Sequence, residues 1–442
     1  MSSLTLARSF FELKIHERYS RERILRLQEK KFRKMLKFAY RHSAFYRDLY
    51  TSNGLKEKDL ETVSIDAIPS VDKEMLMKNF DKVITVDDVS KKELLDFLDN
   101  SKNSNDLFKN KYHVIHTSGS SGKLGIFVYS VKEWDWFYPY ITKTFDFIFA
   151  KKKASFLGAA GGHFTGVSFS SWLNKSVTRF FCQQLILDVN EPIQDIINKL
   201  NAFQPDFLGG YFNGLKVLAE QQERGSLKIN PISIVNCGEG INTKDKEYIE
   251  RVFKAPMSNL YGFAECVVVG VGKDEYRGIY LMDDLALIEV KKDHLLLTNL
   301  VNRTQPIIRY RIDDFVTLKE NHNKKSPFTL IDNIVGRAEF VIWFENGSGQ
   351  MDFIHPLVFT DFYVKGLDKH QLVINDKKSF EFWAVITDKD KNKVVNEIKK
   401  KLDILLSSKN FVDVKYDVKI VDDIKIDNKT GKFKLILHKN QK

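Results

Sequence analysis

A short run of small and hydroxyl-bearing residues has the composition of a phosphate-binding loop. It reads HTSGSSGKLG from His116 to Gly125, and its glycines allow successive backbone N–H groups to turn toward one anion. The hydroxyl groups add hydrogen-bond donors, and Lys123 adds a positive charge. Leu124 stands where a Walker A loop needs the Ser or Thr that binds magnesium, so this is a different kind of loop. Alone, the run fits either a nucleotide-phosphate site or a flexible hairpin tip.

The elements around this loop alternate between strand-like and helix-like segments. The segments YHVIHT before the loop and IFVYS after it both predict strands, which gives a strand–loop–strand arrangement. Further strands are predicted for KASFLGAA, PDFLGGY and PISIVNCG, and helices for EPIQDIINKLNAF, NGLKVLAEQQERG and TKDKEYIERVF. This alternation predicts an α/β fold, in which mostly parallel sheets are flanked by helices.

The last hundred residues have a different pattern, which indicates a second domain. The segment KNKVVNEIKKKLDILLSS predicts an amphipathic helix, and SFEFWAVI and VKYDVKIV predict strands. We therefore expect a large N-terminal domain over residues 1–336 and a small, mobile C-terminal α+β domain over residues 337–442.

Composition restricts the function classes. The chain has 442 residues and a formal net charge of +11, and it lacks the long apolar run of a membrane span. Cys182, Cys237 and Cys266 fit neither a disulfide framework nor a zinc quartet, and the start of the chain lacks a secretory signal pattern. These features predict a cytoplasmic protein that does not act at a membrane.

Much of the positive charge lies in residues 21–47, which hold ten Lys or Arg residues against two Glu and no Asp. Apolar residues recur there at helical spacing, so the segment predicts one basic amphipathic helix. Its charge fits either a solvated face or an anionic partner. No nucleic-acid-binding motif accompanies it, so we expect no nucleic acid partner.

Together with later motifs, the loop resembles that of the acyl-adenylate-forming superfamily, specifically its phenylacetate–CoA ligase-like or coenzyme F390 synthetase-like branch. Further similar segments follow in the family's order along most of the chain. They are SAFYRDLY (43–50), IPSVDKEMLMKNF (68–80), GHFTG (162–166), NCGEG (236–240), YGFAE (261–265), RYRIDD (309–314), VGRAEF (335–340) and NKTGKFK (428–434). No single motif is specific, but the ordered series is.

The resemblance implies roles for individual residues. Lys432 would bridge the carboxylate and the α-phosphate, Glu265 would be the magnesium ligand, and His163 would orient the carboxylate or gate the thiol channel. ATP or AMP would be bound by Thr117, Ser118, Gly119, Ser120, Ser121, Gly122, Lys123, Gly238, Glu239, Gly240, Tyr261, Gly262, Phe263, Ala264, Asp314 and Arg337. Tyr261 would stack on adenine, with Gly262 permitting close approach. The acyl pocket would be lined by Phe164, Tyr211, Phe212 and Phe263.

Several positions depart from the family pattern. Ala264 replaces a hydroxyl residue, Asp313 replaces a glycine beside the ribose aspartate, and Phe340 replaces a polar hinge residue. Gly161 stands where relatives carry a ring beside the acyl pocket, which predicts a wider site for a longer acid. The Cys/His cluster of some relatives is missing after YGFAE, so we expect no zinc.

These observations predict an ATP- and Mg²⁺-dependent acid–thiol ligase. It would convert a small carboxylic acid, aryl or arylalkenoic, into acyl-AMP and then pass the acyl group to a thiol. The thiol would be CoA or the phosphopantetheine of an acidic acyl carrier protein. An adenylyltransferase that passes AMP to a hydroxyl, and a degenerate nucleotide-binding homologue without turnover, remain alternatives. The pathway stays open, and so does assembly as a homodimer.

Overall fold

The chain begins with a helical region that leads into a hairpin. The computed structural model describes residues 3–101, 103–117, 124–144, 152–172, 182–241, 243–292, 294–314, 316–322, 325–332, 342–354, 358–359, 362–424 and 435–439. The elements up to the hairpin and the two short helices after it are α1 (Ser3–His16), α2 (Arg21–His42), α3 (Ala44–Ser52), α4 (Lys73–Lys78), α5 (Phe80–Val83), α6 (Lys91–Asn100), β1 (Tyr112–Thr117), β2 (Gly125–Ser130), α7 (Val131–Asp135) and α8 (Tyr138–Ile141).

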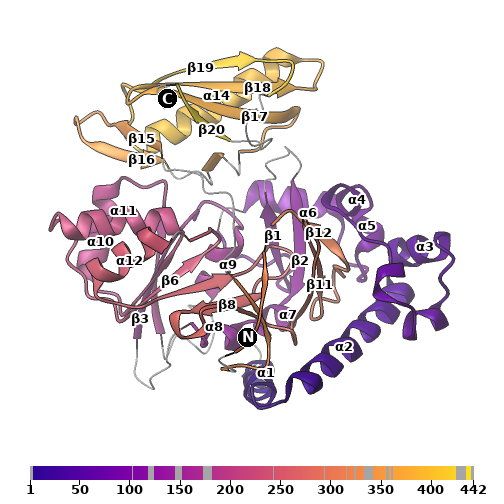
Figure 1. Cartoon of the computed structure of the whole chain (residues 1–442). Coiled ribbons are helices and arrows are strands. Elements are labelled where there is room, and N and C mark those ends of the chain that lie inside the picture. The colour runs from indigo at the N-terminus through magenta and orange to yellow at the C-terminus, as the bar shows by residue number, and fades with distance from the viewer. Residues whose placement is uncertain are drawn as a thin grey trace.

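Helix α2 is the predicted basic amphipathic helix, and it lies along the edge of the molecule (Figure 1). Ser20 caps its start by accepting a hydrogen bond from the backbone N–H of Arg23. The predicted single helix over 21–47 is interrupted at Ser43, whose hydroxyl accepts a hydrogen bond from the Tyr46 N–H and so caps α3. A serine cap inside the apolar periodicity therefore divides the segment into two helices.

A nine-stranded sheet forms the centre of the large domain, in the order β13-β14-β9-β8-β7-β6-β5-β3-β4. The alternating part comprises β3 (Lys152–Gly158), α9 (Thr165–Trp172), β4 (Cys182–Asp188), α10 (Ile193–Phe203), β5 (Phe207–Gly210), α11 (Phe212–Glu223), β6 (Ser233–Cys237), α12 (Thr243–Phe253) and β7 (Met257–Tyr261). The second part comprises β8 (Gly270–Lys273), β9 (Gly278–Leu281), β13 (Leu318–Lys319) and β14 (Thr329–Ile331). The predicted α/β class is confirmed.

Parallel pairing is confined to the strands that helices connect. The neighbours from β4 through β3, β5 and β6 to β7 pair in parallel, whereas β7, β8, β9, β14 and β13 pair antiparallel. Only four residues join β8 to β9, and so short a link cannot cross over to a parallel neighbour. The sheet is therefore mixed rather than mostly parallel.

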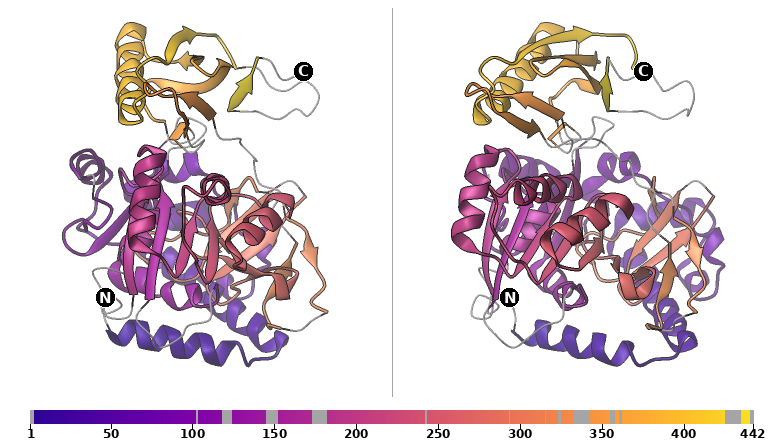
Figure 2. Two further views of the ribbon diagram at one scale, coloured as in Figure 1. Left: turned by 90° about the vertical axis from the view of Figure 1, so that its left-hand side faces the viewer. Right: turned by 60° about the vertical axis from the view of Figure 1, so that its left-hand side comes forward.

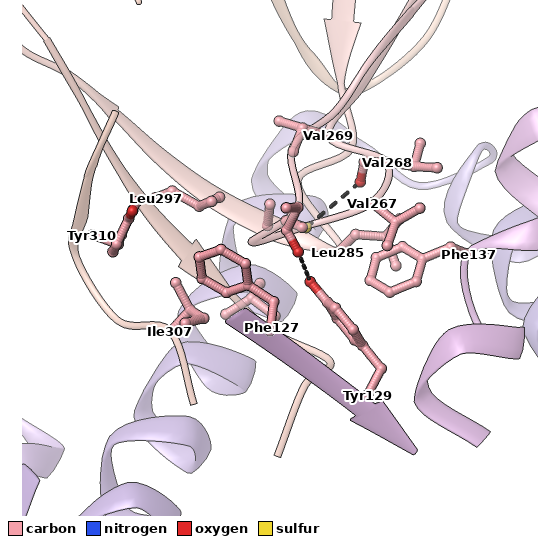
Figure 3. Packing of buried hydrophobic residues seen from close by; sticks show 14 of the residues in the cluster. Phe127, Tyr129, Phe137, Val267, Val268, Val269, Leu285, Leu297, Ile307 and Tyr310 are labelled. Carbon is pink, nitrogen blue, oxygen red and sulfur yellow. Dashed lines mark hydrogen bonds between the residues drawn. The ribbon is translucent and has the colours of Figure 1, made fainter. Parts of the chain in front are cut away.

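Two smaller antiparallel units flank this sheet. Strands β1 and β2 form the predicted hairpin, and β10 (Ala286–Val290), β11 (Leu295–Asn299) and β12 (Tyr310–Ile312) form a three-stranded sheet. Aromatic and aliphatic side chains from these units share one core, in which Tyr129 of β2 and Tyr310 of β12 are buried (Figure 3). This shared core fixes the hairpin relative to the segment that carries YGFAE.

The C-terminal region has its own hydrophobic core and lies beside the large domain on one side (Figures 1 and 2). Its elements are β15 (Ile342–Glu345), β16 (Met351–Ile354), β17 (Leu367–Asp376), β18 (Ser379–Ile386), α14 (Lys391–Ser408), β19 (Lys415–Ile420) and β20 (Ile436–His438). A four-stranded sheet has the order β19-β18-β17-β20, and α14 packs its apolar side into the same core. The predicted boundary at 336–337 lies outside the described residues and stays a prediction.

Candidate active site

The base of the predicted phosphate loop is a closed β-hairpin end. Thr117 at the end of β1 pairs with Gly125 at the start of β2. Lys73, the first residue of α4, lies against this base, since a Cβ added to Gly125 would lie 2.9 Å from the Lys73 Cε atom. Residues 118–123, which include Ser118, Gly119, Ser120, Ser121, Gly122 and Lys123, lie outside the described residues. The described part thus places a lysine beside the point from which the loop departs.

Glu265 is a buried carboxylate near this lysine. Its residue is 7% exposed, and burial raises the pKa of Glu265, while a hydrogen bond from Tyr310 and the charge of Lys73 act in the opposite direction. The preceding carbonyl, that of Ala264, accepts a 2.6 Å hydrogen bond from the Tyr129 hydroxyl (Figure 3). The shared core therefore holds the YGFAE segment firmly, and Glu265 is placed where a nearby cation would favour its charged form.

Tyr261 and Asp314 are brought together from the ends of β7 and β12. The Tyr261 hydroxyl donates a 2.9 Å hydrogen bond to Oδ2 of Asp314, and burial followed by the Asp314 charge raises the pKa of Tyr261 well above its ordinary value. Gly262 has a structural explanation different from the one predicted. A Cβ there would lie 2.0 Å from the Val267 carbonyl oxygen, so the chain's own turn demands glycine. Asp313 is exposed and pairs with Arg311.

The NCGEG segment forms a loop after β6 that is held by side-chain hydrogen bonds. Glu239 accepts hydrogen bonds from the backbone N–H and the side-chain amide of Asn213, at 2.8 and 3.1 Å. Asn236 donates to the Glu239 carbonyl at 2.8 Å. Gly238 has φ +78°, a backbone conformation that favours glycine. The predicted adenine loop is thus a preformed turn, which ends with Gly240.

An apolar cavity of about 850 Å³ begins at these motifs. The predicted site residues that line it come from the hairpin, the loop before α9 and the carboxyl ends of β5, β6 and β7. They are Thr117, Phe164, Tyr211, Gly238, Gly262, Phe263 and Ala264. The structure therefore collects residues from four separate predicted motifs around one space.

Three residues singled out from the sequence are not among the residues that line this cavity. Phe212 was expected to line the acyl pocket; it is the first residue of α11, and its side chain is buried in a hydrophobic cluster with Leu215 and Leu218. His163 is also absent from the lining: its Nε2 lies 3.1 Å from the Ser101 hydroxyl, and its carbonyl accepts a hydrogen bond from the His116 N–H. Gly161 is not among the lining residues either, and the wider site expected from it stays a prediction.

Two residues of the site were not predicted from the sequence. His116 lines the cavity beside Thr117, and its ring lies 4.5 Å from that of Phe164. Lys73 lies in the segment IPSVDKEMLMKNF, which resembles a segment of the family but was given no role in binding or catalysis. A lysine at the start of a helix, far in sequence from the loop, gives no local signal of its use. Of the remaining predicted residues, Lys432 and Arg337, together with Phe340, lie outside the described residues.

The described residues contain no group of three or more His, Cys, Asp or Glu side chains that could hold a metal ion. A Mg²⁺ ion often needs only one or two carboxylates, because nucleotide phosphates and water supply its other oxygen ligands. Glu265 fits such a site as the single protein carboxylate. Among the described helices, none is long and apolar enough to cross a membrane.

The comparisons with known proteins agree with this architecture. A 2-hydroxyisobutyryl-CoA ligase, solved with 2-HIB-AMP and CoA in the thioesterification state, superposes with a TM-score of 0.61, covering 96% of this chain and 91% of that chain at 15% identity. The same ligase in the postadenylation state with R3-HIB-AMP gives 0.59, with the same coverage and identity. The chain has the fold of the acyl-adenylate-forming ligases.

One known protein is similar to this chain in sequence, and its name gives no activity. Protein CapK of Staphylococcus aureus is 24% identical over 395 residues, which cover 86% of this chain and 82% of CapK. No family model matches the sequence. The fold expected from the resemblance is thus confirmed, and membership of the superfamily's phenylacetate–CoA ligase-like branch stays a prediction.

Proposed function

We propose that this protein is an ATP-dependent acid–thiol ligase that forms an acyl-adenylate. The observation that carries the proposal is the position of Lys73 and Glu265 beside the base of the predicted phosphate loop, where Thr117 and Ala264 line one end of an apolar cavity. The likeness of the fold to a ligase solved with an acyl-AMP and CoA supports it. One end of the site is suited to phosphates and the other to the apolar part of an acid.

The first step joins two anions, so the protein must offset their repulsion. A carboxylate oxygen of the acid bonds to the α-phosphorus of ATP, and the bond from that phosphorus to the bridging oxygen breaks to release pyrophosphate. Lys73 and the loop over residues 118–123 supply positive charge and N–H donors to the phosphates. Asp314 accepts hydrogen bonds from the ribose hydroxyls, with its carboxylate oriented by Tyr261.

Glu265 is the residue that would hold Mg²⁺ against the phosphate oxygens. When bound, the ion supplies Lewis-acid neutralisation of the charge that develops on those oxygens. Lys432 would bridge the acid's carboxylate and the α-phosphate from the C-terminal domain. In the second step, a thiolate attacks the acyl carbon and the bond from that carbon to the AMP oxygen breaks. The acceptor is CoA or a protein-bound phosphopantetheine.

Trapping of the acyl-adenylate with hydroxylamine tests the proposal directly. The full chain is incubated with ATP, Mg²⁺ and a panel of aryl and fatty acids, and hydroxamate and pyrophosphate are measured. We expect both products in equal amounts for at least one acid. Lys432→Ala should lower the rate by roughly 10²–10³, which is the usual effect of removing one transition-state donor. Lys439→Ala is the control, because this lysine, seven residues further along the chain, pairs with Glu381 of β18.

Three outcomes would contradict parts of this account. An equal rate for Lys432→Ala and Lys439→Ala would overturn the role of Lys432. Transfer of AMP to a hydroxyl, without a thioester from CoA or from a phosphopantetheinyl carrier protein, would favour an adenylyltransferase. An absence of pyrophosphate with every acid would favour a nucleotide-binding homologue without turnover.

A further inference from the structure

The apolar cavity extends along a face of the parallel strands. Ala154 and Phe156 of β3 line it, and so do Phe207 and Gly209 of β5. Each pair is separated by one residue, and alternate residues of a strand face the same side of a sheet. The sheet face therefore forms the floor of the cavity. Ala154 carries only a methyl group, and Gly209 leaves room for the Phe156 ring, because a Cβ there would lie 3.3 Å from that ring.

The cavity is too long for a single aromatic ring. Its lining on β3 runs from Lys152 to Phe156, which spans about 13 Å at the ~3.3 Å rise per residue of a strand. Beyond Phe156 it continues to Thr117 and Gly262 at the nucleotide motifs. An aryl or arylalkenoic acid, as predicted from the sequence, would fill only the part next to those motifs.

The walls suit an uncharged chain. Helices α8 and α9 contribute mainly aromatic and aliphatic side chains, among them Tyr138, Ile141 and Phe169. The thiol of Cys237 stays neutral because burial raises the pKa of Cys237 to about 12. Lys152 is charged, but its ammonium lies 3.7 Å from the Asp206 carboxylate. A hydrocarbon chain would gain affinity from leaving water here, by up to about fourfold for each methylene.

Helix α1 covers the far end of the cavity. Phe10 and Phe11 line it and are 40% and 66% exposed, so this end of the cavity lies near the surface. The helix is anchored on its other side: Leu13 is fully buried, and Nδ1 of His16 lies 2.6 Å from the buried Asp284 carboxylate. Figure 1 shows α1 on the side of the large domain away from the C-terminal domain. The two ends of the cavity thus lie at opposite sides of the large domain.

We propose that the acid activated by this chain carries a long, flexible apolar chain that lies along the sheet and ends under α1, where Phe10 and Phe11 limit its length. This inference rests on the proposed acid–thiol ligase function and names its substrate class. An aryl acid would leave the stretch from Ala154 to Phe11 filled with water against apolar walls. A long alkyl or alkenyl chain would replace that water along the whole floor.

Acids of graded length test the proposal. Straight-chain acids of 4 to 18 carbons, phenylacetate and cinnamate are compared by kcat/KM for pyrophosphate release. We expect kcat/KM to rise by up to about fourfold per methylene and then to level off at a long chain. Binding of fluorescent cis-parinaric acid, displaced by each unlabelled acid, gives a second measurement that needs neither ATP nor catalysis.

Variants locate the chain within the cavity. Ala154→Phe fills the middle of the floor and should lower the ratio of kcat/KM for long over short acids at least tenfold. Phe11→Ala and Phe10→Ala should move the preferred length toward longer acids. Ile15→Ala is the matched control on α1, because this exposed residue does not line the cavity. Phe11 is mostly exposed, so its variant tests the proposal even where Ala154→Phe fails to fold.

The outcomes separate this inference from the proposed function. Release of pyrophosphate with aryl or short acids only, and displacement of cis-parinaric acid by none of the long acids, overturns the inference and keeps the ligase. Displacement by long acids without pyrophosphate from any acid overturns the ligase and keeps the chain-length assignment. An equal length preference for Phe11→Ala, Phe10→Ala and Ile15→Ala overturns the role of α1.

Discussion

Glu265 is buried, and its neighbours influence whether its carboxyl group is charged. Burial alone disfavours the carboxylate, whereas the hydrogen bond from Tyr310 and the charge of Lys73 favour it. A cation between this carboxylate and the phosphates of a nucleotide would relieve the cost of burial further. The same neighbours lie on β12 and α4, so the site depends on groups far apart in the sequence.

At the same scale, Tyr261→Phe tests whether Asp314 acts on the ribose. The variant removes the 2.9 Å hydrogen bond to the Asp314 carboxylate. A hydrogen bond to a charged group contributes about 1.5–3 kcal/mol, so we expect KM for ATP to rise about tenfold or more, with a smaller change in kcat. The measurement is steady-state kinetics with ATP varied at a saturating concentration of acid.

Tyr280→Phe is the matched control for this prediction. Tyr280 is a buried tyrosine of β9 in the same sheet, and its hydroxyl donates a 2.6 Å hydrogen bond to Asn321. Its loss should cost stability without a specific effect on ATP. A similar rise in KM for both variants would show that the Tyr261 hydrogen bond serves the fold and not the nucleotide.

At the scale of elements, the contact between α14 and α10 joins the C-terminal region to the large domain. The Lys409 ammonium, at the end of α14, donates to the Glu191 carbonyl at 2.6 Å and lies 3.5 Å from Asp352. Asp352 accepts a hydrogen bond from the Ile193 N–H at the start of α10. Lys409 and Asp352 are fully buried, and burial lowers the pKa of Lys409. This contact joins the two parts in the arrangement that Figures 1 and 2 show.

Lys409→Met should weaken this docking strongly. Removal of one partner of a buried ion pair typically costs about 3–5 kcal/mol, because the other charge stays buried without compensation. We expect faster hydrogen exchange at the Ile193 amide and faster proteolysis between the two domains. Lys400→Met on the exposed side of α14 is the control. Equal exchange at Ile193 in both variants would mean that Lys409 does not hold the domains together.

The sequence predicts the elements of both domains well, because their apolar periodicity is local. The helix at Lys391–Ser408 and the strand at Ser379–Ile386 have the predicted bounds. Long-range pairing is not local, so the antiparallel half of the main sheet was not foreseen. The same reason applies to the site: YGFAE and RYRIDD stand out as motifs, whereas Lys73 acquires its place only when α4 packs against the hairpin.

At the scale of the whole molecule, part of the positive charge that first suggested an anionic partner is paired within the chain. Several basic residues of α2 interact within the chain: Arg21 with Asp283, Lys31 with the Asp284 carbonyl, Arg33 with Glu29, Lys37 with Glu61, and Arg41 with Glu57. Much of this charge therefore anchors α2. An acidic carrier protein remains a proposed acceptor beside CoA, and the acceptor assays described above distinguish the two.

The proposed ligase forms its acyl-adenylate in a reversible step. Exchange of labelled pyrophosphate into ATP measures this step without a thiol and without release of the acyl-adenylate. We predict exchange that requires both an acid and Mg²⁺, and that is fastest with long apolar acids. Acid-dependent formation of ADP and phosphate, or an absence of exchange with every acid of the series, would contradict the account.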